Sequence, residues 1–368
     1  MRNPFFTFSW WTALLVLPSI GAAVHQDAMF ERIKIVGANH PNGIFDVSVD
    51  YDDDGVGWLA YSEVELPKYV DTHLARSADG GKTWTYVGSV NKSVDGVKLL
   101  NGKRIEGVWR YETPTLVFDR NDRPSRRWKL FVQKYFAVAP YKKGDSMFAQ
   151  GHVEYRHAAR PDGHWSAPIC LFGPVDLGCR VNLNELHASL RDMVFYNEFG
   201  STVIDGTLYM SLDASPTASG LGSWDKRRIV LIASPDGGES WKYVGTLTDF
   251  EDAEQFGYRV LTGSSLVKEN GRVYLLVTPS GRKGFFVKNR GHDGTLILAF
   301  DDITRASLKR DKDGKLIALT HIEPSLHSGG LSDYHEKNTY GGILFSQIDP
   351  ASGPKVFKAF STRVRISH

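Results

Sequence analysis

Cysteine is scarce in this 368-residue chain: only Cys170 and Cys179 occur, which excludes a small scaffold held by many disulfides. Lys/Arg runs interleaved with aromatic residues are missing, and the formal net charge is only +2, so nucleic acid is not an expected partner. Helical periodicity is almost absent. The chain instead contains 36 Gly, 9 Trp, 15 Tyr and 20 Phe, which is typical of a β-rich protein with a large core.

One long apolar run is present, from Phe5 to about Leu17, and Gly21-Ala22-Ala23 follows it. A run this short before small residues predicts a secretory signal peptide over residues 1–23, with an uncleaved anchor as the alternative. The mature chain, 24–368, would then be secreted or periplasmic, without membrane contact. Cys170 and Cys179 would either pair there in a small loop or remain as two buried thiols.

Two turns repeat each other. Residues 77–84 read SADGGKTW and residues 234–241 read SPDGGESW, with Ser, Asp, Gly, a hydroxyl residue and Trp at the same offsets. A weaker copy, ARPDGHW, ends at Trp165. Asp-Gly-Gly supplies the positive-φ residues of a hairpin loop, and a repeat of several tens of residues that ends in a β-turn indicates a propeller or solenoid. Two unrelated hairpins of similar sequence are the alternative.

Five stretches share one format, in which a strand with a polar start is followed by a turn and an aromatic-rich second strand. They are residues 45–63, 111–133, 197–212, 261–277 and 331–347. No linker divides the chain, so we predict an all-β fold in one domain: a five-bladed β-propeller of four-stranded antiparallel blades. Residues 91–110, 135–150 and 172–194 read as insertions, the last with a short helix.

The repeated turns resemble the Asp-box, S-x-D-x-G-x-[ST]-W, of sialidases and other propellers. The resemblance implies that each turn joins the two outer strands of a blade and buries its Trp between strands. It implies a structural role, distant from any central site.

Carboxylates stand at the start of the first strand of three successive hairpins: Asp46, Glu112 and Glu198. Counted from the second strands, they take corresponding positions, with Thr262 in blade four and Asp333 in blade five. Inner strands of a propeller begin at the central funnel, so these carboxylates are expected to converge there, where like charges raise one another's pKa. The alternative is that each caps a strand or faces solvent.

This pattern resembles the five-bladed glycoside hydrolases of the arabinanase, xylosidase and invertase groups. The resemblance implies that Asp46 is the general base or nucleophile and that Glu198 is the general acid. It implies that Glu112 orients the catalytic groups and raises the pKa of Glu198. Glu112 departs from the usual Asp by one methylene, and the invertase Asn-Asp-Pro-Asn signature is missing. A distant branch with a different substrate is therefore expected.

Four further residues are candidates for substrate binding. Arg110 and Arg259 each precede a first strand, and a guanidinium pairs well with the carboxylate of an acidic sugar. Asp333 and His335 lie near the expected axis in blade five. No cofactor and no metal are expected: Asp50–Gly55 resembles half of a calcium loop but lacks Glu at the twelfth position, so it reads as a hairpin turn.

Three functions remain open: a glycosidase with a carbohydrate substrate, a sialidase-like hydrolase of acidic sugars, and a glycan-binding propeller without catalysis. A deep acidic funnel is expected of the first, and an arginine cluster with a Tyr–Glu pair of the second. A shallow or plugged axis is expected of the third. The sugar, the linkage, the anomeric outcome and the oligomeric state do not follow from the sequence.

Overall fold

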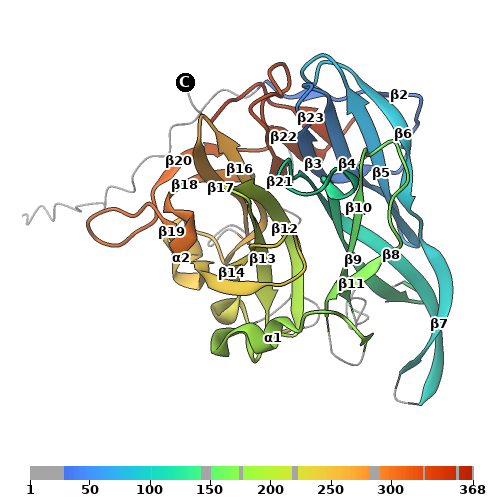
Figure 1. The fold of residues 1–368 in the computed structure, drawn as a ribbon, viewed down its shortest axis with the longest axis horizontal. Coiled ribbons are helices and arrows are strands. Elements are labelled where there is room, and N and C mark those ends of the chain that lie inside the picture. Colours follow the sequence, from blue (N-terminus) through green and yellow to red (C-terminus); the bar gives the residue numbers. More distant parts are fainter. Residues whose placement is uncertain are drawn as a thin grey trace, which may run out of the picture.

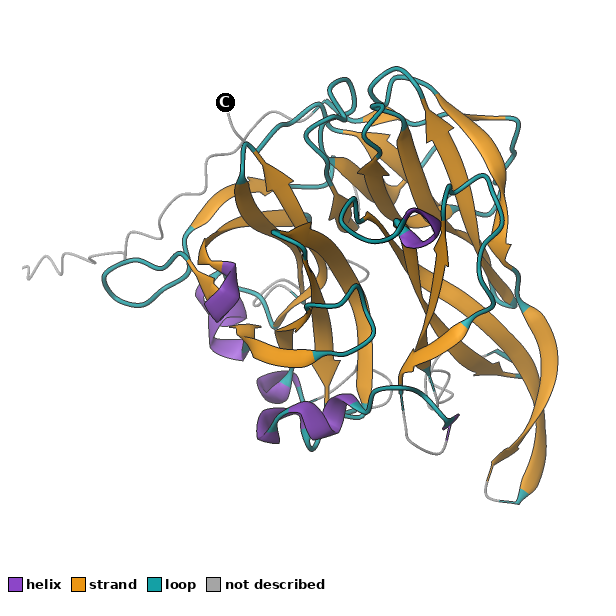
Figure 2. Cartoon of the chain, in the orientation of Figure 1, coloured by secondary structure: helices purple, strands orange, loops and turns teal. Residues whose placement is uncertain are grey.

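The computed structural model describes residues 29–100, 102–141, 151–173, 177–217, 223–281, 291–325, 328–353 and 356–366. Five antiparallel-based sheets form a five-bladed β-propeller, which confirms the predicted fold class (Figure 1). Helices are few and short (Figure 2). The expected signal peptide, 1–23, lies outside the described residues. Within the described ranges, no helix is long and apolar enough to cross a membrane.

Each predicted hairpin is the inner half of one blade. The innermost strands are β3 (Ile44–Tyr51), β8 (Lys103–Phe118), β12 (Phe195–Ile204), β16 (Val260–Glu269) and β21 (Gly329–Asp333). Their antiparallel partners are β4 (Gly57–Glu65), β9 (Trp128–Val138), β13 (Thr207–Ser215), β17 (Arg272–Ser280) and β22 (Leu344–Ile348).

The outer strands complete the blades. They are β5 (Tyr69–Ser77) and β6 (Trp84–Asn91) in blade one, β10 (His152–Ala158) and β11 (Ile169–Phe172) in blade two, β14 (Arg228–Ser234) and β15 (Lys242–Thr248) in blade three, β18 (Thr295–Asp302), β19 (Ser307–Leu308) and β20 (Ala318–Ile322) in blade four, and β23 (Phe357–Ser361) in blade five. Blade one also gains β2 (Ile35–Val36), and blade two gains β7 (Val94–Leu100). With blade four, which has three outer strands, three blades therefore have five strands instead of the predicted four.

Two of the predicted insertions have regular structure. The first forms the β7–β8 hairpin, which projects from blade two (Figure 1). The third contains α1 (Leu183–Leu186), the short helix predicted there, and a 3-10 turn at Ala188–Leu190 follows it. A second helix, α2 (Phe250–Gln255), leads into blade four and begins with a capping box between Asp249 and Asp252.

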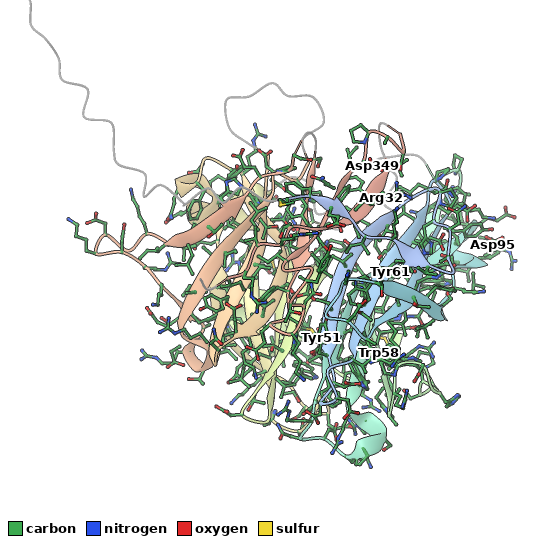
Figure 3. The ribbon with its side chains drawn as sticks, turned by 90° about the horizontal axis from the view of Figure 1, so that it is seen from above. Arg32, Tyr51, Trp58, Tyr61, Asp95 and Asp349 are labelled. Carbon is green, nitrogen blue, oxygen red and sulfur yellow. A yellow bond between two sulfur atoms is a disulfide. The ribbon has the colours of Figure 1, made fainter. Side chains whose placement is uncertain are left out.

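The ring closes through the N-terminal segment. Strand β1 (Glu31–Arg32) pairs antiparallel with β23, so residues from both ends of the described chain form blade five. Arg32 adds an ion pair with Asp349, which follows β22, at 3.2 Å (Figure 3). A two-residue strand carries no period-2 signal, so sequence patterning gives no sign of this closure.

A separate apolar cluster fills each interface between neighbouring blades. This arrangement follows from the alternation of side chains along a strand, because each sheet presents apolar residues to a neighbour on both faces. Trp58, Trp84 and Trp128 are each only 1% exposed. Each contributes on the order of 4 to 6 kcal/mol of transfer free energy.

The repeated turns connect the third and fourth strands of blades one and three. In the second turn, Asp236 accepts hydrogen bonds from Ser234 Oγ at 2.8 Å, Ser240 N at 2.9 Å and Ser240 Oγ at 2.5 Å. Asp79 accepts the equivalent set in the first turn. Trp241, 8% exposed, donates its ring N–H to Gly238 O at 3.1 Å. These turns are structural, as their sequence indicates.

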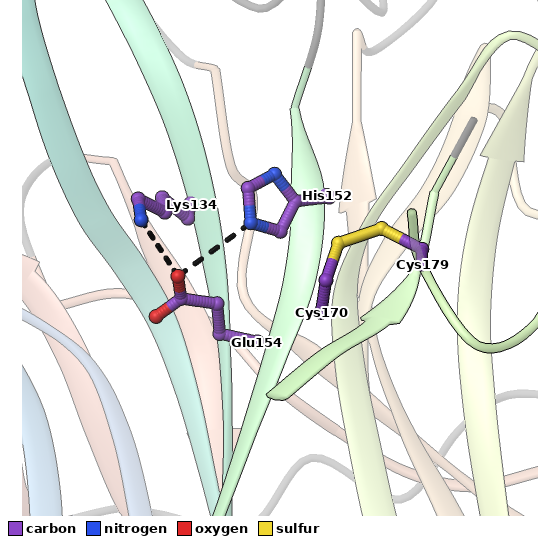
Figure 4. Close-up of a disulfide and its surroundings, with 5 residues drawn as sticks. All are labelled: Lys134, His152, Glu154, Cys170 and Cys179. Carbon is purple, nitrogen blue, oxygen red and sulfur yellow. Dashed lines mark hydrogen bonds and ion pairs between the residues drawn. A yellow bond between two sulfur atoms is a disulfide. The ribbon is translucent and has the colours of Figure 1, made fainter. Parts of the chain in front are cut away.

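Cys170 and Cys179 form a disulfide, which settles the alternative left open by the sequence (Figure 4). It ties β11 to the segment that leads into α1. Beside it, Glu154 accepts a hydrogen bond from Lys134 at 2.7 Å and lies 3.6 Å from His152. The disulfide therefore stabilises the outer part of blade two, away from the inner strands.

Candidate active site

A β-bulge interrupts every inner strand, and in β8, which extends back into the β7–β8 hairpin, it lies well inside the strand. Between Phe45 and Ser48, two residues of β3 face one residue of β4, and the other four inner strands shift register in the same way. One residue of each bulge has a positive φ: Asp46 (51°), Thr113 (51°), Glu198 (47°), Gly263 (56°) and Leu331 (51°). A bulge bends the strand and redirects a side chain, so it is a means of turning residues toward the axis.

The bulges refine the predicted alignment of the carboxylates. Asp46 and Glu198 occupy the same positive-φ position, whereas Glu112 precedes that position in blade two, where Thr113 stands. Asp333 comes two residues after it in blade five, opposite Leu344. Thr262 likewise precedes the positive-φ position of blade four, which Gly263 occupies. The predicted one-to-one correspondence is therefore wrong for Glu112, Thr262 and Asp333, because the turns between paired strands differ in length and a count from the second strand does not give the register.

Small residues allow the inner strands to approach one another closely. A Cβ on Gly200 would lie 2.4 Å from the Cα of Ser265 in the next blade. A Cβ on Gly263 would lie 2.2 Å from a methyl carbon of Leu331. Side chains at these points would force neighbouring blades apart, so both glycines serve the convergence of the strands.

All five inner strands line one cavity at this end of the axis, and its lining includes Asp46 and Glu198. Its volume is about 40 Å³. That is room for a few water molecules, and it is smaller than the roughly 300–1,000 Å³ of typical ligand pockets. Any ligand larger than a few water molecules would therefore have to bind above this ring of residues, with Asp46 and Glu198 beneath it.

Asp46 is buried, with 6% of its surface exposed. Its Oδ2 accepts hydrogen bonds from Ser62 Oγ and Thr113 N, both at 3.1 Å, while its Oδ1 has no partner among the described residues. Burial, together with the charges of Glu112 and Glu198, raises the pKa of Asp46 well above its ordinary value. Asp46 therefore interacts electrostatically with the carboxylates of the next two inner strands.

Glu112 is held from behind by Tyr135, whose hydroxyl donates to Glu112 Oε2 at 2.5 Å. Burial raises the pKa of Glu112, and Glu198 adds to the rise, while Tyr135 and Arg110 oppose it. Arg110 is 2% exposed and donates to the main-chain carbonyls of Pro67 and Lys68. The structure therefore places Arg110 in the wall of the site, where it supports Glu112, and not at the surface expected for substrate binding.

Glu198 is held by blade four. Its Oε2 accepts hydrogen bonds from Gly263 N at 2.8 Å and from the hydroxyl of Thr262. The same hydroxyl lies 2.5 Å from Oδ2 of Asp213, a fully buried residue of β13 that forms an ion pair with Arg227. A chain of four side chains from blades three and four thus ends at Glu198.

The structure raises the pKa of both Asp46 and Glu112, mainly through burial. Asp46 and Glu112 therefore keep their protons to a higher pH than ordinary carboxyl groups do. The arrangement therefore offers both a proton donor and a basic oxygen at one end of the axis, which acid–base catalysis requires.

The other predicted binding residues differ in position. Arg259 is exposed and precedes β16 at the cavity end of that strand, packing against Gly281. Asp333 is buried, and its carboxylate accepts hydrogen bonds from Val49 N at 2.7 Å and Ser265 Oγ at 2.6 Å, so it joins three blades. His335 lines a separate pocket of about 520 Å³ at the opposite end of the inner strands. The structure does not bring His335 to the three carboxylates.

Sequence reasoning missed Asp213, Arg227 and His292. Asp213 and Arg227 lie beyond the hairpin starts that the pattern singled out, and only folding brings them to Thr262. His292 lies beside Phe45, with ring centroids 6.1 Å apart, and burial lowers its pKa to about 4, so it is neutral at neutral pH. In the described ranges, no group of three His, Cys, Asp or Glu residues could hold a metal ion.

No protein-family model and no curated protein matches the sequence. Among solved structures, the chain resembles Zg3597, a family 117 glycoside hydrolase of Zobellia galactanivorans, at 12% identity and a TM-score of 0.54, over 94% of this chain and 93% of that one. It also resembles an α-L-arabinofuranosidase of Lactobacillus brevis at 14% identity and a TM-score of 0.51, over 87% of this chain and 91% of that one.

A microbial sialidase, Hz136, aligns with 86% of this chain at 14% identity and a TM-score of 0.48, and this chain spans 56% of its length. Identities this low show a shared fold. Together with the five sheets described above, the comparisons show that this chain has the five-bladed propeller fold found in glycoside hydrolases.

Proposed function

We propose that the protein is a glycoside hydrolase that acts on a carbohydrate at the funnel end of the axis. One observation carries the proposal: Asp46 and Glu198 line one cavity at the end of the inner strands, and the charges of Glu112 and Glu198 help to raise the pKa of Asp46. Asp46 is buried and the two glutamates are half-buried, and a group of partly desolvated carboxylates is typical of catalytic sites. The shared fold of known glycosidases supports the same conclusion.

In this mechanism, Glu198 donates a proton to the glycosidic oxygen as its bond to the sugar carbon breaks. Asp46 accepts the proton of the attacking water, or attacks the sugar directly in a retaining variant. Once ionised, Asp46 is a stronger base than an ordinary aspartate, since basicity rises with pKa. Glu112, fixed by Tyr135, orients and tunes the pair.

The test compares Glu198→Gln and Asp46→Asn on paired substrates, drawn from a panel of aryl glycosides and natural oligosaccharides. Glu198→Gln should lower turnover by roughly 10²-fold or more on a poor leaving group, and much less on an aryl leaving group that needs little protonation. Asp46→Asn should impair both. Asp50→Asn is the matched control, because Asp50 stands on the same strand at the opposite end of the axis.

A second candidate is a glycan-binding propeller without catalysis. The small volume of the cavity, about 40 Å³, favours it. This candidate predicts that the protein binds an oligosaccharide in calorimetry but hydrolyses none of the panel, and that Glu198→Gln leaves the affinity unchanged.

A sialidase-like activity is less well supported. A Tyr–Glu pair exists, Tyr135 with Glu112, but Tyr135 is only 2% exposed and cannot reach a substrate as a nucleophile. Arg110 and Arg227 are both engaged by protein groups, so of the arginines considered, Arg259 alone is exposed at this end.

A further inference from the structure

A cavity of about 260 Å³ lies where the N-terminal segment crosses from blade five, through β1, to blade one, through β2. Its lining consists of residues 32–35 and 38–40, with Ile44 of β3 and Lys358 of β23. Three of these described residues are cations, Arg32, Lys34 and Lys358, and none of them is Asp or Glu. A hollow surrounded by charge of one sign concentrates ions of the opposite sign, so this cavity favours anions.

Lys358 is the buried cation of the cavity. Only 4% of its surface is exposed, and its ammonium donates a hydrogen bond to the main-chain oxygen of His40. Within the described part of the chain, it forms no ion pair with a carboxylate. An ammonium has three N–H donors, so two of them are left for a ligand or for water. A buried charge without a counter-ion is costly, and an anion in the cavity would remove this cost.

The neighbouring charges leave the cavity positive. Burial and the charge of Arg32 lower the pKa of Lys358, and the charges of two acids, Asp349 and Glu63, oppose this change. Asp349 is already paired with Arg32, at 3.2 Å. Glu63 lies 2.9 Å from Nδ1 of His40 and does not line the cavity. Both acids therefore act on Lys358 from a distance, and neither neutralises it by direct contact.

We infer that this cavity binds an oxyanion, such as sulfate, phosphate or carboxylate, with the ammonium of Lys358 as the main contact. Lys34 and Arg32 are exposed and provide further positive charge at the rim. Hydrogen bonds from an ammonium to an anionic oxygen are roughly twice as strong as those between neutral groups, and burial of Lys358 strengthens them further. None of these three residues takes part in the proposed hydrolysis.

The position of the cavity gives the anion two sources. Ile44 lines it, and Asp46, two residues further along β3, lines the axial cavity. Two residues of extended strand span roughly 7 Å, so both cavities lie at the same end of β3. The oxyanion is therefore either a free inorganic ion or the acidic group of a glycan bound over the axis. The second source rests on the proposed function, and the first does not.

Isothermal titration calorimetry with sodium sulfate and sodium phosphate tests the inference, with sodium chloride added to keep the ionic strength constant. We expect saturable binding of one ion per chain. Lys358→Met keeps the apolar stem and removes the charge, so it should weaken binding roughly 10-fold or more, and Lys358→Arg should restore most of the affinity. Lys242→Met is the matched control, because Lys242 is an exposed lysine of β15 in blade three and its loss changes the net charge equally.

Thermal melts without added anion establish that each variant is folded. The inference is overturned if sulfate, phosphate and acidic oligosaccharides all fail to bind saturably, or if Lys358→Met binds them as tightly as the wild type does. Should Lys358→Met fail to fold, Lys34→Met decides, since an unchanged affinity in that variant overturns the inference as well.

Oligosaccharides distinguish the two sources of the anion. If a glycan provides it, sulfated or uronate-containing oligosaccharides should bind roughly 10-fold or more tightly than neutral ones, and Lys358→Met should abolish this preference. If the ligand is a free ion, acidic and neutral oligosaccharides should bind alike, while sulfate binding still depends on Lys358. Calorimetry needs no hydrolysis, so anion binding without glycan hydrolysis would refute the proposed glycosidase and leave this site standing. Hydrolysis without anion binding would refute the site and leave the glycosidase.

Discussion

Asp236 in the second repeated turn offers a quantitative test of structural against catalytic roles. Its carboxylate accepts hydrogen bonds from Ser234 Oγ, Glu239 N, Ser240 N and Ser240 Oγ, at 2.5 to 3.1 Å. Asp236→Ala removes all four acceptor contacts at once. Because the turn is solvent-exposed, the released donors can bond water, so the cost is far below the sum of four buried bonds.

The closest physical analogy is the loss of a helix N-cap, which also removes an exposed acceptor of main-chain N–H groups and costs about 1–2 kcal/mol. Unfolding entropy is about 2.1 cal/mol/K per residue, or roughly 0.7 kcal/mol/K for a folded chain of about 340 residues. A loss of about 1.5 kcal/mol therefore lowers the melting temperature by about 2 °C.

The pH dependence provides a second measurement on the same variant. Partial burial raises the pKa of Asp236, but the hydrogen bonds from Ser240, Ser234 and Glu239 outweigh it and lower this pKa to about 2. A depressed carboxyl pKa contributes stability above the unfolded-state pKa of about 3.9, and this contribution is lost as the pH falls through about 2. The difference between wild type and Asp236→Ala should be constant above about pH 5 and should shrink below pH 4.

Calorimetric melts of wild type, Asp236→Ala and Asp79→Ala provide the assay. Asp162→Ala is the matched control, because Asp162 in the weaker copy of the turn accepts side-chain hydrogen bonds only from the exposed Arg160 among the described residues. This substitution should lower the free energy of unfolding by less than about 0.5 kcal/mol. Glycan hydrolysis should remain within about twofold in all three variants. An unchanged melting temperature with hydrolysis abolished would refute the structural reading of these turns.

Three further predictions follow from burial, the disulfide and the leader. Burial raises the pKa of Asp50 to about 7, against hydrogen bonds from Phe118 N and Tyr51 N, so the stabilising effect of its proton is present below about pH 4 and is lost as the pH rises through 7. Between pH 4 and pH 8, the free energy of unfolding of Asp50→Asn should therefore rise by up to roughly 4 kcal/mol relative to that of wild type, measured in urea titrations. A difference in unfolding free energy that stays constant over this range would contradict the raised pKa. Cys170→Ser should lower the free energy of unfolding by roughly 2–3 kcal/mol, and denatured wild type should resist thiol labelling unless reduced; labelling without reductant would exclude the disulfide. We propose that the protein is exported, so intact-mass measurement should find a mature chain that begins near Ala22 or Val24, and a retained Met1 would refute this.

Local sequence was sufficient for the elements of the propeller. The five hairpins and the two Asp-Gly-Gly turns were predicted because side-chain alternation and positive-φ residues act within a few positions of the chain. That Asp46 and Glu198 line one end of the axis was also predictable, because equivalent inner strands of a closed ring face one axis. The alignment of Glu112 was not, since the turns between the paired strands differ in length and the register cannot be counted across them.

Tertiary structure alone decided the chemistry around the carboxylates. The burial of Arg110 behind Glu112, the position of His335 at the far end of the axis, and the pairing of Arg227 with Asp213 all depend on contacts between separate strands or blades. Desolvation, which is the largest cause of the raised pKa of Asp46, is a property of an assembled interior. A linear pattern records which residue types are present, but not which of them lose water when the blades come together.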